Sequence, residues 1–335
     1  MEPLYPGDPE RIGPYRVLAR LDAPLPEAPA AEERFLARDM AGDRTVLLAT
    51  PLEGVEPDRF AGEAEAARRL SAPWLAAVDE AAPSGGPAWH AGPYLPAVPL
   101  PAALAAHGAP LPERTVLALG TALAETLVTL HQAGITHAGV SPAAVLLAAD
   151  GPRLTGFGAL RAAGPDGQPR AGLPGLTPGA VPPEQLSGAR PQPPGDVYAL
   201  GAVLAYAVTG HTVPERGRLP ERLRGLISAC TAGNPDNRPQ TCQVLDELLY
   251  GAAPGGGFGP APQEVAPHGA AVPHGAAPHE AVPHGATPYE ATPHGAVPPG
   301  ARAAALFGPG WLPPRAVAEL ARQSAELLAM DPRTD

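Results

Sequence analysis

The first third of the chain contains short, mostly apolar runs bounded by turn residues, a pattern that is typical of β-strands. Five strands are predicted there, at residues 15–21, 34–39, 44–50, 74–79 and 88–95. A glycine-containing connection at 40–43 predicts a hairpin between the second and third of them. Between the strands, residues 57–71 have a helical period, with an apolar stripe formed by Phe60, Ala64, Ala67 and Leu70. This part is therefore predicted to be a small sheet with one helix.

Beyond a proline-rich stretch at 96–101 the period of the apolar residues becomes helical. Helices are predicted between Pro112 and Gly134, and at residues 197–209, 220–231 and 240–250. The helix at 197–209 is apolar on all sides, which predicts deep burial. Two short apolar runs at 144–148 and 153–155 predict a hairpin, followed by a long loop at 162–183. The expected fold class is α+β, with a small strand-rich lobe at 11–95 and a larger helical lobe at 96–250.

The composition changes abruptly after residue 250. Residues 251–300 contain Pro-His-Gly-Ala and its variants every five or six residues, and a repeat without an apolar face cannot offset its ordering entropy. A disordered linker is predicted at 251–310. Residues 311–330 are predicted to carry a short amphipathic helix, with helical period at 314–330. Such a helix is marginal alone, so it either docks on an unknown protein partner or folds back on its own domain as a cap.

The charge and composition narrow the function classes. The chain has 335 residues and a net charge of -11, which argues against nucleic-acid and anionic-membrane partners because both need clustered cations. All 23 residues counted as Lys+Arg are arginine, so a mechanism that needs a lysine is excluded. Cys230 and Cys242 form no metal or disulfide framework, and neither a signal peptide nor a long apolar stretch is present, so a cytoplasmic location is expected.

Several motifs occur in a fixed order along the chain. Residues 130–147 read LHQAGITHAGVSPAAVLL, 156–158 read GFG, 182–184 read PPE, 195–201 read GDVYALG and 236–239 read DNRP. In this order they resemble the bacterial serine/threonine protein kinases, over roughly residues 11 to 250. The resemblance implies a protein-kinase-like fold of two lobes, and in that family ATP with Mg²⁺ is bound between them.

The positions that carry chemistry in the resembled family have lost it here. The phosphate-pairing lysine, the catalytic base, the loop lysine, the metal-binding asparagine and the metal-binding aspartate correspond to Ala49, Gly139, Ser141, Ala144 and Gly156. The segment 22–29, where the family has a glycine-rich loop, has no glycine and three prolines. The expected protein is therefore a pseudokinase without cofactor that acts as a protein-binding or regulatory scaffold. The alternative is a weak or unconventional ATP-dependent kinase that uses ATP with Mg²⁺.

Other family positions are retained. The resemblance implies an ion pair between Glu184 and Arg238, an Asp196 carboxylate that holds the catalytic-loop backbone, and packing of His137 and Phe157 between the lobes. Glu63 stands where the family's lysine partner would be, and it is left without that lysine.

Two further segments bear on regulation and metal binding. Residues 159–176 contain no Ser, Thr or Tyr, so a phosphorylation switch has no acceptor before Thr177. Histidines of the tail repeat are weak candidates for Zn or Ni binding, the alternative being a solvated spacer: His268, His274, His279, His284 and His294.

Overall fold

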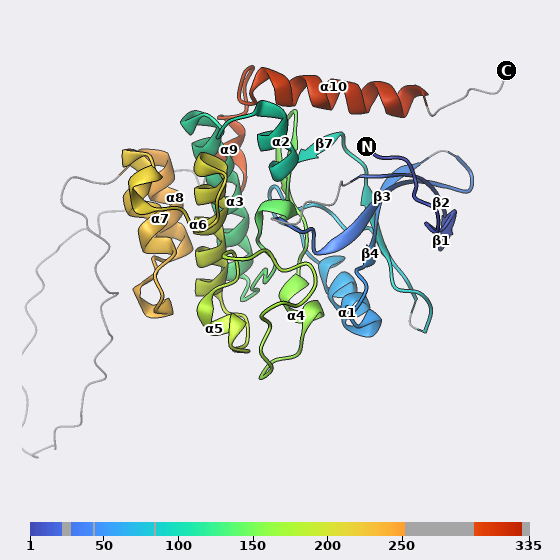
Figure 1. Ribbon diagram of the computed structural model, residues 1–335, viewed down its shortest axis with the longest axis horizontal. Helices are drawn as coiled ribbons and strands as arrows, with labels where there is room; N and C mark the ends of the chain where they lie inside the picture. Colours follow the sequence, from blue (N-terminus) through green and yellow to red (C-terminus); the bar gives the residue numbers. More distant parts are fainter. Residues whose placement is uncertain (22–27, 43, 84, 252–297, 330–335) are drawn as a thin grey trace, which may run out of the picture.

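The computed structural model describes residues 1–21, 28–42, 44–83, 85–251 and 298–329. Within these residues the chain forms a small lobe around an antiparallel sheet and a larger lobe that consists mainly of helices (Figure 1). The predicted α+β arrangement of two lobes is confirmed. The tail histidines lie in the repeat at 252–297, outside the described residues.

The small lobe contains a six-stranded sheet in the order β1-β2-β3-β4-β6-β5, in which neighbouring strands are antiparallel. Its strands are β1 (Arg11–Ile12), β2 (Tyr15–Arg20), β3 (Glu32–Asp39), β4 (Thr45–Pro51), β5 (Glu80–Ala81) and β6 (His90–Pro93). The predicted hairpin joins β3 to β4, and its register pairs Arg34 with Ala49. Side chains of paired residues lie on the same face of a sheet, so this pair places an arginine next to the alanine.

The helix of the small lobe, α1 (Pro57–Ala67), starts as the sequence suggests. Pro57 occupies the first turn, and the Glu56 carboxylate before it accepts hydrogen bonds from the N–H groups of Asp58 and Arg59. The buried residues are Phe60, Ala64 and Ala67, the apolar stripe of the sequence pattern. The helix packs against α4 (Ala159–Ala163) of the larger lobe, and this contact brings Glu63 to the cleft.

The predicted strand at 74–79 is wrong. The start of this segment runs beside β9 (Gly151–Leu154): the Leu154 N–H donates to the Trp74 carbonyl over 2.7 Å, and the Ala76 N–H donates to the Leu154 carbonyl over 2.8 Å. Its end reaches the small-lobe sheet, where the Asp79 N–H donates to the Ala91 carbonyl of β6 over 2.9 Å. Trp74 has a φ of 59°, which turns the chain out of the strand path. A short apolar run does not distinguish pairing within the sheet from pairing with a hairpin of the other lobe.

The larger lobe is built around two long helices, α3 (Glu113–Gln132) and α6 (Pro193–Thr209). The all-apolar sequence of α6 is buried on nearly every side, and Gly210 ends the helix in a left-handed conformation with a φ of 80°. The remaining helices of this lobe before the masked repeat are α2 (Leu100–His107), α4, α5 (Pro183–Leu186), α7 (Glu221–Cys230) and α8 (Thr241–Tyr250). None of the described helices is both long and apolar enough to cross a membrane.

A three-stranded sheet of order β7-β8-β9 joins the two lobes, with β7 at Ala97–Pro99 and β8 at Val145–Ala148. The hairpin β8–β9 corresponds to the predicted one. Helix α2, which follows β7 directly, was not predicted because its first turn contains Pro101 within a proline-rich stretch. Proline is tolerated there because the first helical N–H groups have no partner within the helix.

The chain returns to the domain after the repeat. Residues 298–310, which were assigned to the linker, carry α9 (Ala301–Ala304), so the linker prediction is wrong for these residues. The predicted terminal helix is present as α10 (Pro314–Ala329), which runs across α2 and β7 (Figure 1). Trp311, Leu312, Ala316 and Leu320 belong to the same apolar core as α3 and α6.

Candidate functional site

The site expected from the sequence is the cleft between the lobes, where β3 and β4 face the β8–β9 hairpin. On β4, Ala49 is completely buried and presents no charge. Its register partner Arg34, 3% exposed, crosses the cleft: its guanidinium donates to Thr155 Oγ1 over 3.2 Å and to the Ala143 carbonyl over 3.1 Å. A cation is thus present beside Ala49, but it comes from the neighbouring strand. Arg34 and Ala49 lie at equal numbers of residues from the predicted hairpin turn at 40–43, and this spacing could have identified the pair from the sequence.

Glu63 on α1 is not left without a partner. Its carboxylate accepts two hydrogen bonds from the Arg161 guanidinium, Nε to Oε1 over 2.8 Å and Nη2 to Oε2 over 2.7 Å. Gly158 allows this approach, because a Cβ atom there would lie 2.1 Å from Glu63 Oε2. The carboxylate that could have paired with a lysine is therefore occupied by an arginine of α4.

The position of the catalytic base, Gly139, has no room for a side chain. A Cβ atom at Gly139 would lie 1.8 Å from the carbonyl oxygen of Gly156 and 3.1 Å from the Ala159 side chain. The first obstacle is backbone, which cannot move aside as a flexible side chain would. Two glycines that resemble separate catalytic positions are thus packed against each other, and the close approach requires glycine at position 139.

The positions expected to hold a metal ion offer no ligand. Gly156 has a φ of 72°, and a Cβ atom there would lie 3.6 Å from the Cβ of Ala144. Mg²⁺ is bound through oxygen atoms, and neither residue has one in its side chain. The Ser141 hydroxyl accepts a hydrogen bond from the Ala144 N–H over 3.3 Å, which caps the short 3₁₀ helix Pro142–Ala144. In the described parts of the chain no three His, Cys, Asp or Glu side chains cluster as a metal site.

Asp196 organises the loop that resembles the catalytic loop. Its carboxylate accepts hydrogen bonds from the N–H groups of His137 and Ala138, over 2.7 and 2.8 Å, and contacts His131 Nε2 over 2.9 Å. His137 is completely buried, its ring packs edge-on against Phe157 at 5.6 Å, and both ring nitrogens lack a partner in the structure. Burial lowers the pKa of His137 to about 4, so the ring is neutral at pH 7. The neutral ring acts as a packing element.

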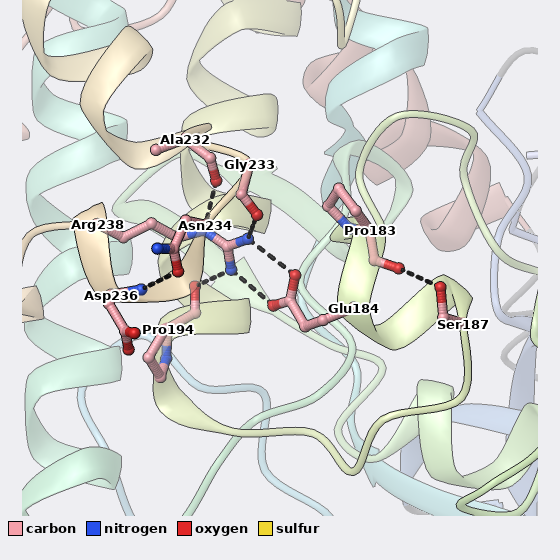
Figure 2. Close-up of polar contacts among 9 residues, drawn as sticks. All are labelled: Pro183, Glu184, Ser187, Pro194, Ala232, Gly233, Asn234, Asp236 and Arg238. Carbon is pink, nitrogen blue, oxygen red and sulfur yellow. Dashed lines mark hydrogen bonds and ion pairs between the residues drawn. The ribbon is translucent and has the colours of Figure 1, made fainter.

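The ion pair implied between Glu184 and Arg238 is formed. Two parallel hydrogen bonds of 2.7 and 2.8 Å join the guanidinium to the carboxylate (Figure 2). The same guanidinium also donates to three backbone carbonyls, those of Pro194, Ala232 and Gly233. Because the Arg238 side chain is completely buried, this cluster connects α5 with the start of α6 and the segment before α8.

A second buried arginine, which the sequence did not point to, holds the loop that follows α4. Arg170 is completely buried and donates to the Asp166 carboxylate over 2.7 Å. It also donates to four backbone carbonyls, those of Leu160, Gly164, Gln185 and Ala189. The loop without Ser, Thr or Tyr is thus ordered by an internal cation. A single arginine in a Gly/Pro-rich stretch carries no periodic signal, which explains why the sequence did not reveal it.

Known proteins with similar sequences share one description. The chain is 37% identical over 269 residues to the probable serine/threonine-protein kinase PkwA of Thermomonospora curvata, covering 74% of this chain and 35% of the relative. It is 32% identical over 277 residues to the serine/threonine-protein kinase AfsK of Streptomyces coelicolor, covering 75% and 34%. The chain spans about a third of the length of these curated relatives. No protein-family model matches it.

The fold comparison agrees with the sequence comparison. The crystal structure of the Mycobacterium tuberculosis PknI kinase domain superposes with a TM-score of 0.52 at 24% sequence identity, covering 71% of this chain and 97% of that domain. The predicted protein-kinase-like fold is therefore confirmed. The prediction that the chain takes no cofactor is overturned, because its relatives are serine/threonine-protein kinases, a class of enzyme that uses ATP with Mg²⁺.

Proposed function

We propose that the chain is a member of the bacterial serine/threonine protein kinase family that no longer transfers phosphate and acts as a binding or regulatory module, a pseudokinase. ATP with Mg²⁺ is the ligand that members of this family bind between the two lobes. The proposal concerns the transfer step and does not require that nucleotide binding be absent.

The observation that carries the proposal is the contact between Gly139 and Gly156. A general base must come within hydrogen-bond reach of the proton that it accepts, and position 139 has neither a carboxylate nor space for one. General-base catalysis contributes about 10²- to 10⁴-fold, and typical kinases turn over at about 1–100 s⁻¹. Since Ala144 and Gly156 also lack metal ligands, turnover is expected at least roughly 10⁴-fold below that range.

The second candidate is a weak ATP-dependent serine/threonine kinase, and the names of the relatives favour it. In this candidate Arg34 supplies the cation that position 49 lacks, because it lies beside Ala49 and reaches both Thr155 and Ala143. Arginine pairs well with phosphate oxygens, so the substitution is chemically reasonable. The two candidates therefore differ in whether a phosphate acceptor is modified at this site.

The test incubates the full chain with radiolabelled ATP and Mg²⁺, together with casein or myelin basic protein, beside a known serine/threonine kinase. No incorporation above a mock preparation is expected, into the substrate or into the chain itself. A parallel thermal-shift measurement with ATP and Mg²⁺ reports binding separately from transfer, because a ligand of the folded state raises the unfolding temperature.

Matched variants decide the assignment of any signal. Arg34→Gln removes the cleft cation, and Arg38→Gln makes the same change four residues along β3. Incorporation that disappears in Arg34→Gln and persists in Arg38→Gln would establish the kinase alternative and end the pseudokinase proposal. Incorporation that is equal in all three proteins would instead be traced to a contaminating kinase.

A further inference from the structure

The C-terminal segment is attached to the larger lobe by contacts at three places. The buried Glu125 carboxylate on α3 accepts hydrogen bonds from the N–H groups of Arg302 and Ala303, each over 3.2 Å, at the start of α9. The Trp311 indole N–H donates to the Ala149 carbonyl over 2.9 Å, and the backbone carbonyl of Trp311 accepts a hydrogen bond from Thr115 Oγ1 over 2.6 Å. These contacts fix the point from which α10 departs.

Phe307 adds an aromatic contact to this attachment. Its ring packs edge-on against Trp74 at 4.9 Å and against Trp311 at 4.7 Å. Trp74 itself donates its indole N–H to Glu125 over 3.2 Å, so the aromatic group and the carboxylate that holds α9 form one cluster. The segment is thus held by both apolar and polar contacts, which favours one defined position for α10.

Helix α10 lies on its own domain, the second of the two alternatives for this helix. Ala316 is completely buried, Leu320 is 6% exposed and Gln323 is 4% exposed on the face toward α2 and β7, whereas Val317 is 48% exposed on the outside. Burial of the apolar Leu320 side chain stabilises this docked position of the helix. Figure 1 shows α10 extending over α2 toward the side of the small lobe.

The position of α10 makes it a wall of the groove between the lobes. This groove has a volume of about 310 Å³ and is lined by Leu21 and Arg34 of the small lobe, by Val98 of β7 and by Ala143 of the larger lobe. Glu319, Arg322 and Gln323 of α10 line the same groove. The volume lies at the lower end of the range for small-molecule sites. The cleft that Arg34 crosses is therefore completed by a segment nearly 300 residues further along the chain.

Gln323 indicates that this wall is built to contact a ligand. Its side-chain oxygen Oε1 is buried and has no hydrogen-bond partner, although the residue lines the groove. A buried acceptor without a partner destabilises the folded state, and a ligand hydroxyl or N–H group that donates to it would remove that cost. Arg322 is already paired with Glu319 and Glu326, so the amide of Gln323 is the group of α10 best suited to this contact.

We propose that α10 and the two lobes form one composite ligand site, in which Gln323 accepts a hydrogen bond from a nucleoside phosphate held between the lobes. Such a ligand has a flat apolar part for Leu21 and Val98, an anionic end for Arg34 and hydroxyl or N–H donors for Gln323. This inference rests on the family's nucleotide site and adds the helix to it. Because ligand and helix share one site, binding of the ligand stabilises the docked helix, and docking of the helix raises the affinity to the same degree.

The experiment measures binding of ATP, ADP and adenosine to the full chain by calorimetry, with and without Mg²⁺. Leu320→Asp places a charge in the buried face of α10 and releases the helix, and Val317→Asp makes the same change on its exposed face. Gln323→Leu removes the acceptor oxygen and replaces the amide with an apolar side chain of similar size. Hydrogen exchange of α10, with and without ligand, reports whether the helix is docked.

We expect Val317→Asp to bind like the wild type, Leu320→Asp to bind at least about tenfold more weakly, and Gln323→Leu to bind about five- to tenfold more weakly with α10 still protected. Ligand should also slow hydrogen exchange in α10 of the wild type. Equal or tighter binding by Leu320→Asp would overturn the proposal, as would unchanged binding by Gln323→Leu. If the wild type binds none of the three ligands, the composite site is refuted while the proposed loss of phosphate transfer stands. If phosphate transfer is detected, the proposed loss of transfer is refuted, and the binding of the three variants still decides the composite site.

Discussion

Glu184→Ala would leave the Arg238 guanidinium buried without its carboxylate. The Arg238 side chain is completely buried and that of Glu184 is 25% exposed, so water can replace the carboxylate only in part. Two charge-assisted hydrogen bonds of 2.7 and 2.8 Å are lost, each worth about 1.5–3 kcal/mol. Three backbone carbonyls still accept from the guanidinium, which limits the damage. The expected loss is about 3 kcal/mol, the lower end of the range for a broken buried pair.

The assay is urea unfolding of the full chain followed by circular dichroism, with the denaturant slope held constant between variants. A loss of about 3 kcal/mol corresponds to a fall of roughly 6–12 °C in Tm for a domain of this size. Glu184→Gln keeps one acceptor oxygen and removes the charge, so it should cost less than Glu184→Ala. As the matched control, Glu65→Ala breaks only solvent-exposed ion pairs with Arg68 and Arg69 and should leave the free energy of unfolding nearly unchanged.

A double-mutant cycle separates the pair from its surroundings. Arg238→Met alone should also destabilise the larger lobe, because it leaves the Glu184 carboxylate and three carbonyls without their donor. The combined variant should lose at least about 2 kcal/mol less than the sum of the two single variants. Strict additivity would show that the two groups do not interact, and a cost of Glu184→Ala as small as that of Glu65→Ala would refute the burial argument.

Two further predictions concern groups that are completely buried. Burial lowers the pKa of His137 from 6.5 to about 4, so between these pH values the unfolded chain binds more protons than the folded chain. The free energy of unfolding should therefore fall as the pH decreases from about 6.5 toward 4, by about 3 kcal/mol in total. Urea unfolding at pH 7 and pH 5 should show a smaller pH dependence of the unfolding free energy in His137→Phe than in the wild type. The groups that face the ring, Asp196, Arg161 and His131, are unchanged in this variant. An identical pH dependence in both proteins would contradict the assignment to His137. Arg170→Lys cannot reproduce the planar fork that reaches four carbonyls, so hydrogen exchange should accelerate across residues 159–190, and protection equal to the wild type would count against that role.

The longer helices of the larger lobe, α3, α6, α7 and α8, could be predicted because each has an apolar stripe or an apolar core sequence, whereas α2, α4 and α5 were not predicted. The ends of α3, α7 and α8 lie within about two residues of the expected positions. The pairing of Glu184 with Arg238 was also predictable, since the order of the motifs implied one chain path that brings the two together. Periodicity reports on local structure, and it was sufficient for these helices. Motif order reports on a known topology, and it was sufficient for this ion pair.

The contacts that distinguish this cleft could not be predicted in the same way. Arg34, Arg161 and Arg170 each join segments through partners that no local pattern identifies. In each case the sequence showed only that a group is missing: the lysine at position 49, the lysine partner of Glu63, and the phosphate acceptors of residues 159–176. The loss of lysine was visible in the sequence, but the arginine beside Ala49 depends on strand register. The loss of phosphate acceptors was visible too, but the cation that orders their loop depends on tertiary packing.

These arginines also explain why α10 is the element most suited to a regulatory role. Arg34 ties β3 to the larger lobe, Arg161 ties α4 to α1, and Arg170 ties the following loop to α5. Guanidinium groups held by several acceptors resist the lobe and loop movements that commonly gate such a cleft. Helix α10 is instead attached to the core of the larger lobe by Ala316 and Leu320, and these apolar contacts can be broken without leaving a buried charge unpaired. A ligand in the groove would therefore act on the helix more readily than on the lobes, and the position of the C-terminal segment would report whether the groove is occupied.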